Sequence, residues 1–344
     1  MYDRLADLPL TVEDWTLEGF ERDTTSGFVR ASTVVVLEGA GETGRGEDVT
    51  YETGDHEVLQ REGLDLPTGE FSLDGFSTAL DDIDCFPEPP DREVFRNYRR
   101  WALESAALDL ALKQADTDLG RALGRDYDPV RFVVSTRLGE PPTTDRVDEL
   151  LEYDPEMEFK LDPTPEWGDD LVTDLGSREC VRILDLKGQY EGTEVDVAAD
   201  PDLYERVVEG FPEAVVEDPK LTDETEAIFD GHEARVSWDA PIHSRADIEA
   251  LPFEPEWCNI KPSRFGTVES LLDAIEYCEE REITMYGGGQ FELSVGREHI
   301  QALAALFYPD TPNDVAPGGY NDPDLPDGLP RSPLAPPSTP CGFC

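Results

Sequence analysis

The chain has 344 residues, and its 78 aspartates and glutamates outnumber its 28 lysines and arginines, which gives a formal net charge of -50. A field of this sign and size excludes nucleic acid as a partner and disfavours anionic membrane surfaces. The acids are spread over the whole length, and apolar residues (38%) fall in patterned runs, so we expect a folded protein and not a disordered acidic one.

Charge and lysine usage also indicate a compartment. A folded acidic chain with five lysines against 23 arginines suits a salt-rich cytoplasm, because salt screens the repulsion between the acids. We therefore predict a halophilic, cytoplasmic protein, without a membrane helix or a signal peptide. Six scattered cysteines fit a reducing compartment. The "CGFC" of Cys341 and Cys344 is either a redox or metal pair or a frayed tail, and we expect the tail.

The first half of the chain begins as a β-rich region. Three strands are expected within 15–24, 27–39 and 45–53, separated by Gly, Thr and Asp turns. A proline-rich breaker at 85–91 follows. After it, apolar residues at helical spacing predict one long helix over 92–124 that ends in glycines.

From residue 130 the pattern changes to short apolar runs, each followed by a polar helical stretch. This alternation predicts parallel strands with helical crossovers, and eight such runs predict a barrel. The runs lie at 130–136, 157–162, 180–188, 213–219, 234–241, 257–263, 282–289 and 313–317.

Charged residues end five successive runs: Lys160, Asp185, Glu217, Asp239 and Lys261. In a parallel barrel the carboxyl ends of the strands meet at one mouth. Three carboxylates there repel one another unless a cation neutralises them, and oxygen ligands suit Mg²⁺. A lysine facing such a metal can lose its proton and act as a base, which arginine cannot do. The alternative is that each acid caps a helix, but that does not explain why so rare a residue as lysine stands here.

Several segments resemble those of a known family. "ILDLKG" (183–188), "VVEDP" (215–219) and "SWDAPIHSRADI" (237–248) resemble the three metal-binding strands of the enolase superfamily, in its muconate-lactonizing and mandelate-racemase-like branch. "NIKPSRFG" (259–266) is similar to the sixth-strand lysine motif, and "GETGRGED" (41–48) to the signature that closes the capping sheet. The resemblance, to a haloarchaeal-type member, covers nearly the whole chain.

The resemblance implies a fold and a domain plan. The fold is α/β, a modified TIM barrel (β/α)₇β with an N-terminal α+β capping domain. Capping-domain loops, here around 21–27 and 52–57, would choose the substrate. The implied parts are residues 1–92, the β-rich part of the capping domain; 93–128, helices leading into the barrel; 129–320, the catalytic barrel; and 321–344, a proline-rich tail.

The resemblance also implies an activity. Members bind a small carboxylate through Mg²⁺ and remove its α-proton, which forms a metal-stabilised enediolate. By resemblance, Asp185, Glu217 and Asp239 are the metal ligands and Lys261 is the base. Whether the protein forms a homo-oligomer is left open by the sequence.

The second strand departs from the family pattern. It usually ends in K-x-K, with the second lysine as the other catalytic group, but here Lys160 is followed by Asp162. Both count as catalytic candidates. The change argues against lysine–lysine epimerisation and favours a lyase or dehydratase-type elimination, in which one base suffices. The alternatives are a racemase, epimerase or cycloisomerase that uses Lys160 with Lys261, and a metal-binding barrel without catalysis.

Five further residues are candidates for the mouth. Lys187 replaces a usual asparagine and either binds a second substrate carboxylate or phosphate or offsets the surrounding acids. His243 is either a general acid or a helix-capping or surface residue. Gln290 and Glu292 follow three glycines that either approach a ligand or form a tight turn, and both are candidate substrate contacts. Arg264 is either an anion site or, as we favour, an ion-pair partner for the acid-rich surface.

Overall fold

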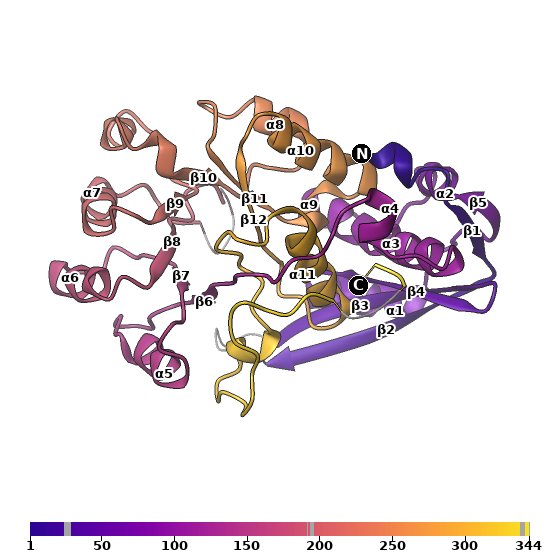
Figure 1. Ribbon diagram of the computed structural model, residues 1–344, viewed down its shortest axis with the longest axis horizontal. Coiled ribbons are helices and arrows are strands. Elements are labelled where there is room, and N and C mark those ends of the chain that lie inside the picture. The colour runs from indigo at the N-terminus through magenta and orange to yellow at the C-terminus, as the bar shows by residue number, and fades with distance from the viewer. Residues whose placement is uncertain (24–28, 191, 193–195, 338–340, 344) are drawn as a thin grey trace.

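The computed structural model describes residues 1–23, 29–190, 192, 196–337 and 341–343. Within them the chain forms an N-terminal capping domain built on antiparallel strands and a C-terminal barrel built on parallel strands (Figure 1). Both parts contribute side chains to one large hydrophobic core. Among the helices of these ranges, none combines the length and the apolar character that crossing a membrane requires.

The capping domain holds two antiparallel sheets. β2 (Asp14–Asp23), β3 (Val29–Gly39) and β4 (Glu42–Asp48) form a three-stranded sheet in that order, near the three strands expected from the sequence. β1 (Pro9–Val12) pairs with β5 (Gly69–Ser72) in a second sheet that was not expected. The helices of this domain are the 3₁₀ turn η1 (Tyr2–Arg4), α1 (Thr53–Glu62), α2 (Leu73–Leu80), α3 (Val94–Gln114) and α4 (Leu119–Leu123).

The prediction of one helix over 92–124 is wrong. The chain turns between α3 and α4, where Asp116 takes a left-handed φ of 50°. Asp118 then starts α4, because its carboxylate accepts a hydrogen bond from the Arg121 amide at 2.9 Å.

The structure tests only one of the two loops that were expected to choose the substrate. The segment 52–57 is not a loop, since α1 begins at Thr53. The segment 21–27 falls in part on residues 24–28, which lie outside the described residues.

Two glycines of "GETGRGED" allow β4 to pack closely against the long helix α3. α3 packs directly on β4, and a Cβ at Gly44 would lie 2.2 Å from the Ala106 carbonyl oxygen. A Cβ at Gly46 would lie 2.0 Å from the Ala102 carbonyl oxygen. Only glycine therefore lets the helix backbone approach the strand so closely.

The barrel is built on seven parallel strands in chain order, with helices on the outside (Figure 1). The strands are β6 (Val134–Thr136), β7 (Phe159–Leu161), β8 (Val181–Asp185), β9 (Val215–Glu217), β10 (Val236–Trp238), β11 (Trp257–Ile260) and β12 (Thr284–Gly287). The helices and 3₁₀ turns are α5 (Asp145–Tyr153), α6 (Asp169–Ser177), α7 (Pro201–Gly210), η2 (Glu226–Phe229), η3 (Glu233–Arg235), α8 (Arg245–Glu249), α9 (Pro262–Phe265), α10 (Val268–Glu280), α11 (Val295–Phe307) and η4 (Gly318–Asn321).

The eighth run, 313–317, contains no strand, so the prediction of eight strands is wrong in this detail. The segment nevertheless lies between the first and last strands of the sheet. The Asp314 amide donates to the Gly287 carbonyl of β12 at 2.8 Å, and the Val133 amide donates to the Asn313 carbonyl at 2.8 Å. The Asn313 amide also donates to the Arg131 carbonyl at 3.4 Å, which makes an isolated parallel bridge and not a ladder, but these bonds connect the two edges of the sheet.

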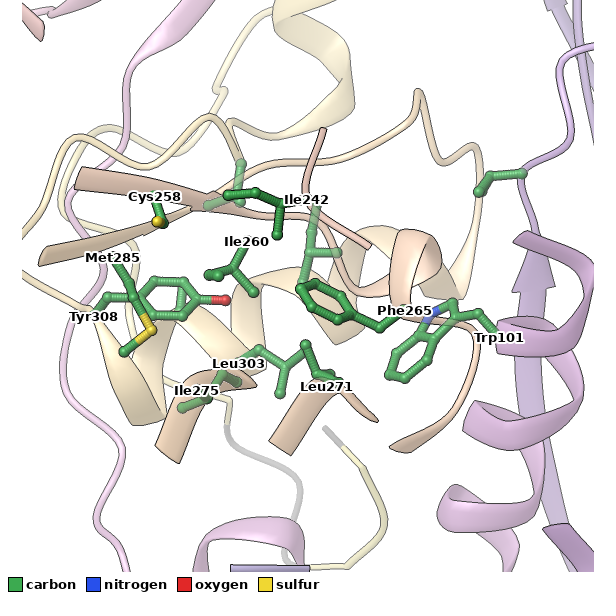
Figure 2. Packing of buried hydrophobic residues seen from close by; sticks show 14 of the residues in the cluster. Trp101, Ile242, Cys258, Ile260, Phe265, Leu271, Ile275, Met285, Leu303 and Tyr308 are labelled. Atoms are coloured by element: carbon green, nitrogen blue, oxygen red, sulfur yellow. The ribbon is translucent and has the colours of Figure 1, made fainter. Parts of the chain in front are cut away.

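The capping domain and the barrel share a packed interface around α3. Figure 2 shows Trp101 of α3 directed toward Phe265 and Leu271 of the barrel. All three side chains are buried, with at most 4% of their surface exposed. The orientation of α3 is therefore fixed from both sides, by β4 and by the barrel.

The C-terminal segment is also packed, so the expectation of a frayed tail is wrong for residues 341–343. Phe343 is fully buried, and its ring stacks on His299 of α11 with 4.1 Å between centroids. The Phe343 amide donates to Asp109 of α3 at 2.9 Å. Cys344, the second cysteine of the expected pair, lies outside the described residues.

One carboxylate joins the capping domain to the start of α11. Glu47 of β4 is 1% exposed and accepts hydrogen bonds from the backbone amides of Leu293, Ser294 and Gly296 at 2.7 to 3.1 Å. It also accepts from the Ser32 hydroxyl at 2.6 Å. Amides at a helix start lack partners within the helix, so a residue of one domain satisfies the orphan donors of the other.

We predict that Glu47→Gln destabilises the whole fold, because an amide cannot accept from every donor that the carboxylate satisfies. Buried donors without partners cost about 1–3 kcal/mol each, so the free energy of unfolding should fall by roughly 3 kcal/mol. Urea unfolding at constant high salt measures it. Glu57→Gln, on the exposed face of α1, is the matched control and should change stability little. Equal stabilities of the two variants would contradict the prediction.

A second prediction concerns acid stability. Burial lowers the pKa of His299 to about 4, while Asp109 acts to raise it and Lys113 to lower it. An unfolded histidine titrates near pH 6.5 and so binds a proton more readily than the folded one. His299 should therefore cost up to about 3 kcal/mol of stability as pH falls from about 6.5 to 4, and nothing above that window.

The measurement compares wild type with His299→Leu at several pH values. The gap between their unfolding free energies should shift in favour of the leucine variant as the solution is acidified. A constant gap from pH 7 to pH 4 would show that His299 does not titrate in this way.

Candidate metal centre and active site

Strand register brings three carboxylates to one end of the barrel. Asp185 and Glu217 are paired residues at the ends of β8 and β9. Glu217 pairs with Ser237 of β10, and Asp239 lies two residues further on. All three side chains are fully buried, and each offers an oxygen within 4.8 Å of the other two. These residues, the carboxylate cluster, lie together as the sequence suggested.

Each member of the carboxylate cluster contacts a positive side chain. Lys160 Nζ lies 2.5 Å from Glu217 Oε1 and 3.5 Å from Asp185 Oδ2. Lys187 Nζ donates to Asp185 Oδ2. Lys261 Nζ lies 2.8 Å from Asp239 Oδ2, and Arg264 Nη1 lies 2.8 Å from Asp239 Oδ1. Four cations therefore surround three buried acids.

The charges in this group shift its pKa values. Burial acts to raise the pKa of Asp239, but Arg264 and Lys261 outweigh it and hold that pKa well below its usual range. Burial likewise raises the pKa of Glu217, to about 8, because Asp185 and Asp239 add to the effect against Lys160. Burial acts to lower the pKa of Lys187, but neighbouring acids hold it above its ordinary value.

The residues present fit a divalent cation. The possible ligands are three carboxylates. Such an all-oxygen set suits Mg²⁺, whereas zinc is usually bound by sulfur and nitrogen ligands. The three oxygens also converge within 4.8 Å of one another, close enough to share one ion. Asp185, Glu217 and Asp239 can hold such an ion.

Sequence reasoning missed residues that position the carboxylate cluster. Asp218 accepts hydrogen bonds from the Asp239 and Ala240 amides, both at 2.8 Å, and so ties the end of β9 to that of β10. Glu217 Oε2 accepts from Asn259 at 3.1 Å and from the Tyr286 hydroxyl. Asn259 could have been found, because it lies two residues before Lys261 and alternate residues of a strand share a face.

Tyr190 is another residue that was missed. Its hydroxyl donates to Asp239 Oδ2 at 2.7 Å, and Arg264 Nη2 lies 3.2 Å from the same hydroxyl. Nothing in the sequence around Tyr190 distinguishes it from other loop residues. Only the fold brings it to Asp239, 49 positions later in the chain.

Three of the other candidates are held in contacts of their own. Asp162 pairs with Arg137 at 3.0 Å and lies 3.6 Å from Lys187 Nζ. The His243 amide donates to Asp247 at 3.1 Å and its ring Nδ1 lies 3.2 Å from the Pro241 carbonyl oxygen, but the residue that caps α8 is Ser244. Arg264 is an ion-pair partner, but of the buried Asp239, and its own side chain is buried too, so the expectation of a partner for the acid-rich surface is wrong.

Gln290 connects the two domains. Its side-chain oxygen accepts from the Tyr51 hydroxyl at 2.7 Å, and its side-chain nitrogen donates to the Tyr98 hydroxyl at 3.1 Å. Its carbonyl accepts from Arg30 at 3.0 Å. Glu292 accepts from the Gln290 amide at 2.7 Å. These contacts place both residues at the boundary between the capping domain and the barrel.

The glycines before Gln290 have a steric explanation. A Cβ at Gly288 would lie 2.6 Å from Asn259 Oδ1 and 2.8 Å from Lys261 Cε. The absence of a side chain at Gly288 therefore leaves room for the lysine that contacts Asp239. Neither of the expected explanations, close approach of a ligand or a tight turn, included this one.

Solved structures define the class of fold. A member of the enolase superfamily from Listeria innocua is 19% identical, with a TM-score of 0.65, and the match covers 90% of this chain and 86% of that one. A dipeptide epimerase from Methylococcus capsulatus, complexed with Mg and the dipeptide L-Arg-D-Lys, is 19% identical, with a TM-score of 0.69 and coverage of 91% and 92%. The chain therefore has the enolase-superfamily fold, and the resemblance is confirmed at this level.

The chain itself belongs to the family described as Domain of unknown function (DUF8230), whose C-terminal domain matches residues 126–322 and whose N-terminal domain matches 3–122. It is also similar to the o-succinylbenzoate synthase of Bacillus subtilis (strain 168), 28% identical over 239 residues. That match covers 65% of this chain and 60% of the length of the relative. Both of the relatives named for an activity, the synthase and the epimerase, are enzymes.

We predict that Asp239→Asn weakens Mg²⁺ binding at least about 100-fold, because it removes one charged ligand of three. Calorimetric titration in concentrated KCl measures the affinity and suppresses weak binding to surface acids. Asp170→Asn, on the exposed first turn of α6, removes one acid elsewhere and should bind Mg²⁺ like wild type. Affinities of the two variants within twofold of each other would argue against a metal site at the carboxylate cluster.

Proposed function

We propose that this protein is a Mg²⁺-dependent enzyme that removes the α-proton of a small carboxylate in a lyase-type elimination. The observation that carries the proposal is the position of Lys261, whose Nζ lies 2.8 Å from Asp239 of the carboxylate cluster. When bound, Mg²⁺ would supply positive charge that stabilises the negative charge developing on the substrate carboxylate.

The residues of the chain divide the work. Asp185, Glu217 and Asp239 would hold the ion. Lys261, at the end of β11 and 7% exposed, would take the α-proton in its neutral form, a role that an arginine cannot fill. The leaving group would then depart from the neighbouring carbon with the electron pair of its bond.

Elimination is the preferred reaction because Lys160 is fully engaged. It is 1% exposed, and besides Glu217 and Asp185 its Nζ lies 3.6 Å from Asp314. A lysine surrounded by three carboxylates is poorly placed to exchange a proton with a substrate. One base suffices for an elimination, whereas epimerisation uses a group on each face of the substrate.

A racemase, epimerase or cycloisomerase remains the second candidate. Besides Lys261, the ammonium groups of Lys160 and Lys187 contact the carboxylate cluster, at Glu217 and Asp185, and such a reaction would use one of them as its second group. The shared fold does not separate the reactions, since similar structures include an epimerase and a muconate lactonizing enzyme. The name of the Bacillus subtilis relative, o-succinylbenzoate synthase, supports a carboxylate as the substrate class.

The composition supports a setting for this activity. With a formal net charge of -50, the chain is suited to a salt-rich cytoplasm, where counter-ions screen its surface. A small anionic substrate would meet less repulsion in such a medium than in dilute buffer.

We predict that Lys261→Ala lowers the rate of α-proton exchange with D₂O by about 10²–10⁴-fold, because a positioned base contributes that much. The assay follows deuterium in a panel of carboxylic acids incubated with enzyme and Mg²⁺. Lys261→Arg is the matched control: it keeps the charge beside Asp239 but cannot act as a base, so it should be equally slow. Wild-type exchange in either variant would exclude Lys261 as the base.

The same panel separates the reaction classes. Loss of a group from the substrate supports elimination, and deuterium uptake without such loss supports the second candidate. No exchange with any acid would favour a metal-binding barrel without catalysis.

A further inference from the structure

Three lysine ammonium groups contact the carboxylate cluster, and the elimination does not explain the role of the one on Lys187. Lys187 follows β8 and donates to Asp185, whereas Lys261 follows β11 and contacts Asp239. β9 and β10 lie between these two strands in the sheet. The two lysines therefore contact different members of the cluster, from strands that are not neighbours.

The backbone at Lys187 is held in an unfavourable conformation. Its φ is +54°, in the left-handed region that non-glycine residues rarely adopt. The Lys187 amide donates to Asp185 Oδ1 at 3.1 Å, which holds the residue in this conformation. Strain of this kind persists where the surrounding structure enforces it, most often at functional sites.

Three groups fix the Lys187 ammonium. Besides its contact with Asp185, its Nζ lies 3.6 Å from Asp162 Oδ1 and 5.5 Å from the centre of the Tyr190 ring. Asp162 Oδ1, the oxygen that faces this lysine, is buried and makes no hydrogen bond among the described residues, while Asp162 Oδ2 pairs with Arg137. The aspartate that departs from the expected K-x-K pattern thus anchors an ammonium group supplied by the next strand.

Lys187 is also the most accessible lysine at the carboxylate cluster. Its side chain is 18% exposed, against 8% for Lys261 and 2% for Lys160. Lys187 is not the sole cation beside Asp185, because Lys160 Nζ lies 3.5 Å from that residue. An ammonium group that is fixed and partly open can contact a ligand.

We infer that Lys187 is a catalytic residue that contacts the substrate carboxylate and stabilises the second negative charge that develops when Lys261 removes the α-proton. The inference rests on the proposed function and deepens it. Lys187 acts as a fixed charge and moves no proton. Asp162 acts as a positioning residue that holds the ammonium in place.

Oxalate tests this role without knowledge of the substrate. It is a dianion, as the substrate becomes when its α-proton leaves, and its binding to the Mg²⁺-loaded protein can be measured by calorimetry. Lys187→Met should weaken oxalate binding roughly 10- to 100-fold, the value of one charge-assisted contact. Its affinity for Mg²⁺ alone should be unchanged or higher, since one competitor for Asp185 is gone.

Further variants separate charge from structure. Lys187→Arg keeps the charge and should lose less than about threefold in oxalate affinity, and Asp162→Asn should lose an intermediate amount. Lys113→Met removes the same charge on α3, where Lys113 pairs with Asp109, and should bind oxalate like wild type. Circular dichroism checks that each variant is folded.

The outcomes distinguish the inference from the proposal beneath it. Wild type that binds no Mg²⁺ overturns both. Wild type that binds Mg²⁺ and oxalate, with Lys187→Met within twofold of it for oxalate, overturns only the role of Lys187. Equal losses in Lys187→Met and Lys187→Arg also overturn it, since a fixed charge would then not be what matters.

Discussion

Three buried carboxylates within 4.8 Å of one another are the constraint on which the rest of this structure depends. Their mutual repulsion in a medium of low dielectric would unfold the mouth of the barrel unless positive charge lay beside them. The chain supplies that charge from separate strands and loops. Three of its five lysines, Lys160, Lys187 and Lys261, are placed here, together with one arginine, Arg264.

The capping domain and the barrel are also joined by buried polar groups. Glu47 satisfies the amides at the start of α11, and Arg30, fully buried, donates to carbonyls of both domains. Because buried donors and acceptors without partners are costly, neither domain can move away from the other without exposing or stranding these groups. The residues between them, Gln290 and Tyr51 among them, are held at a fixed distance from the carboxylate cluster.

Sequence reasoning recovered the parts of this plan that repeat along the chain. Strand ends at Asp185, Glu217 and Asp239 could be predicted because short apolar runs recur and parallel strands all end at one mouth. Contacts between distant segments could not. No local pattern shows that Glu47 accepts hydrogen bonds from residues 293–296. Nor does one show that a side chain at Gly288 would collide with Lys261, or that 313–317 forms no regular strand. Periodicity reports which face of an element is buried and not what lies against it.

The ion pairs of the carboxylate cluster have a consequence for the folded chain without its ion. Many metal sites exist only after the ion has bound, so their proteins stay unfolded without it. Here Lys160, Lys187, Lys261 and Arg264 already serve as internal counter-ions. An ion that binds at the carboxylate cluster would therefore not be needed to hold these acids together in the folded chain, and its release would leave the architecture intact.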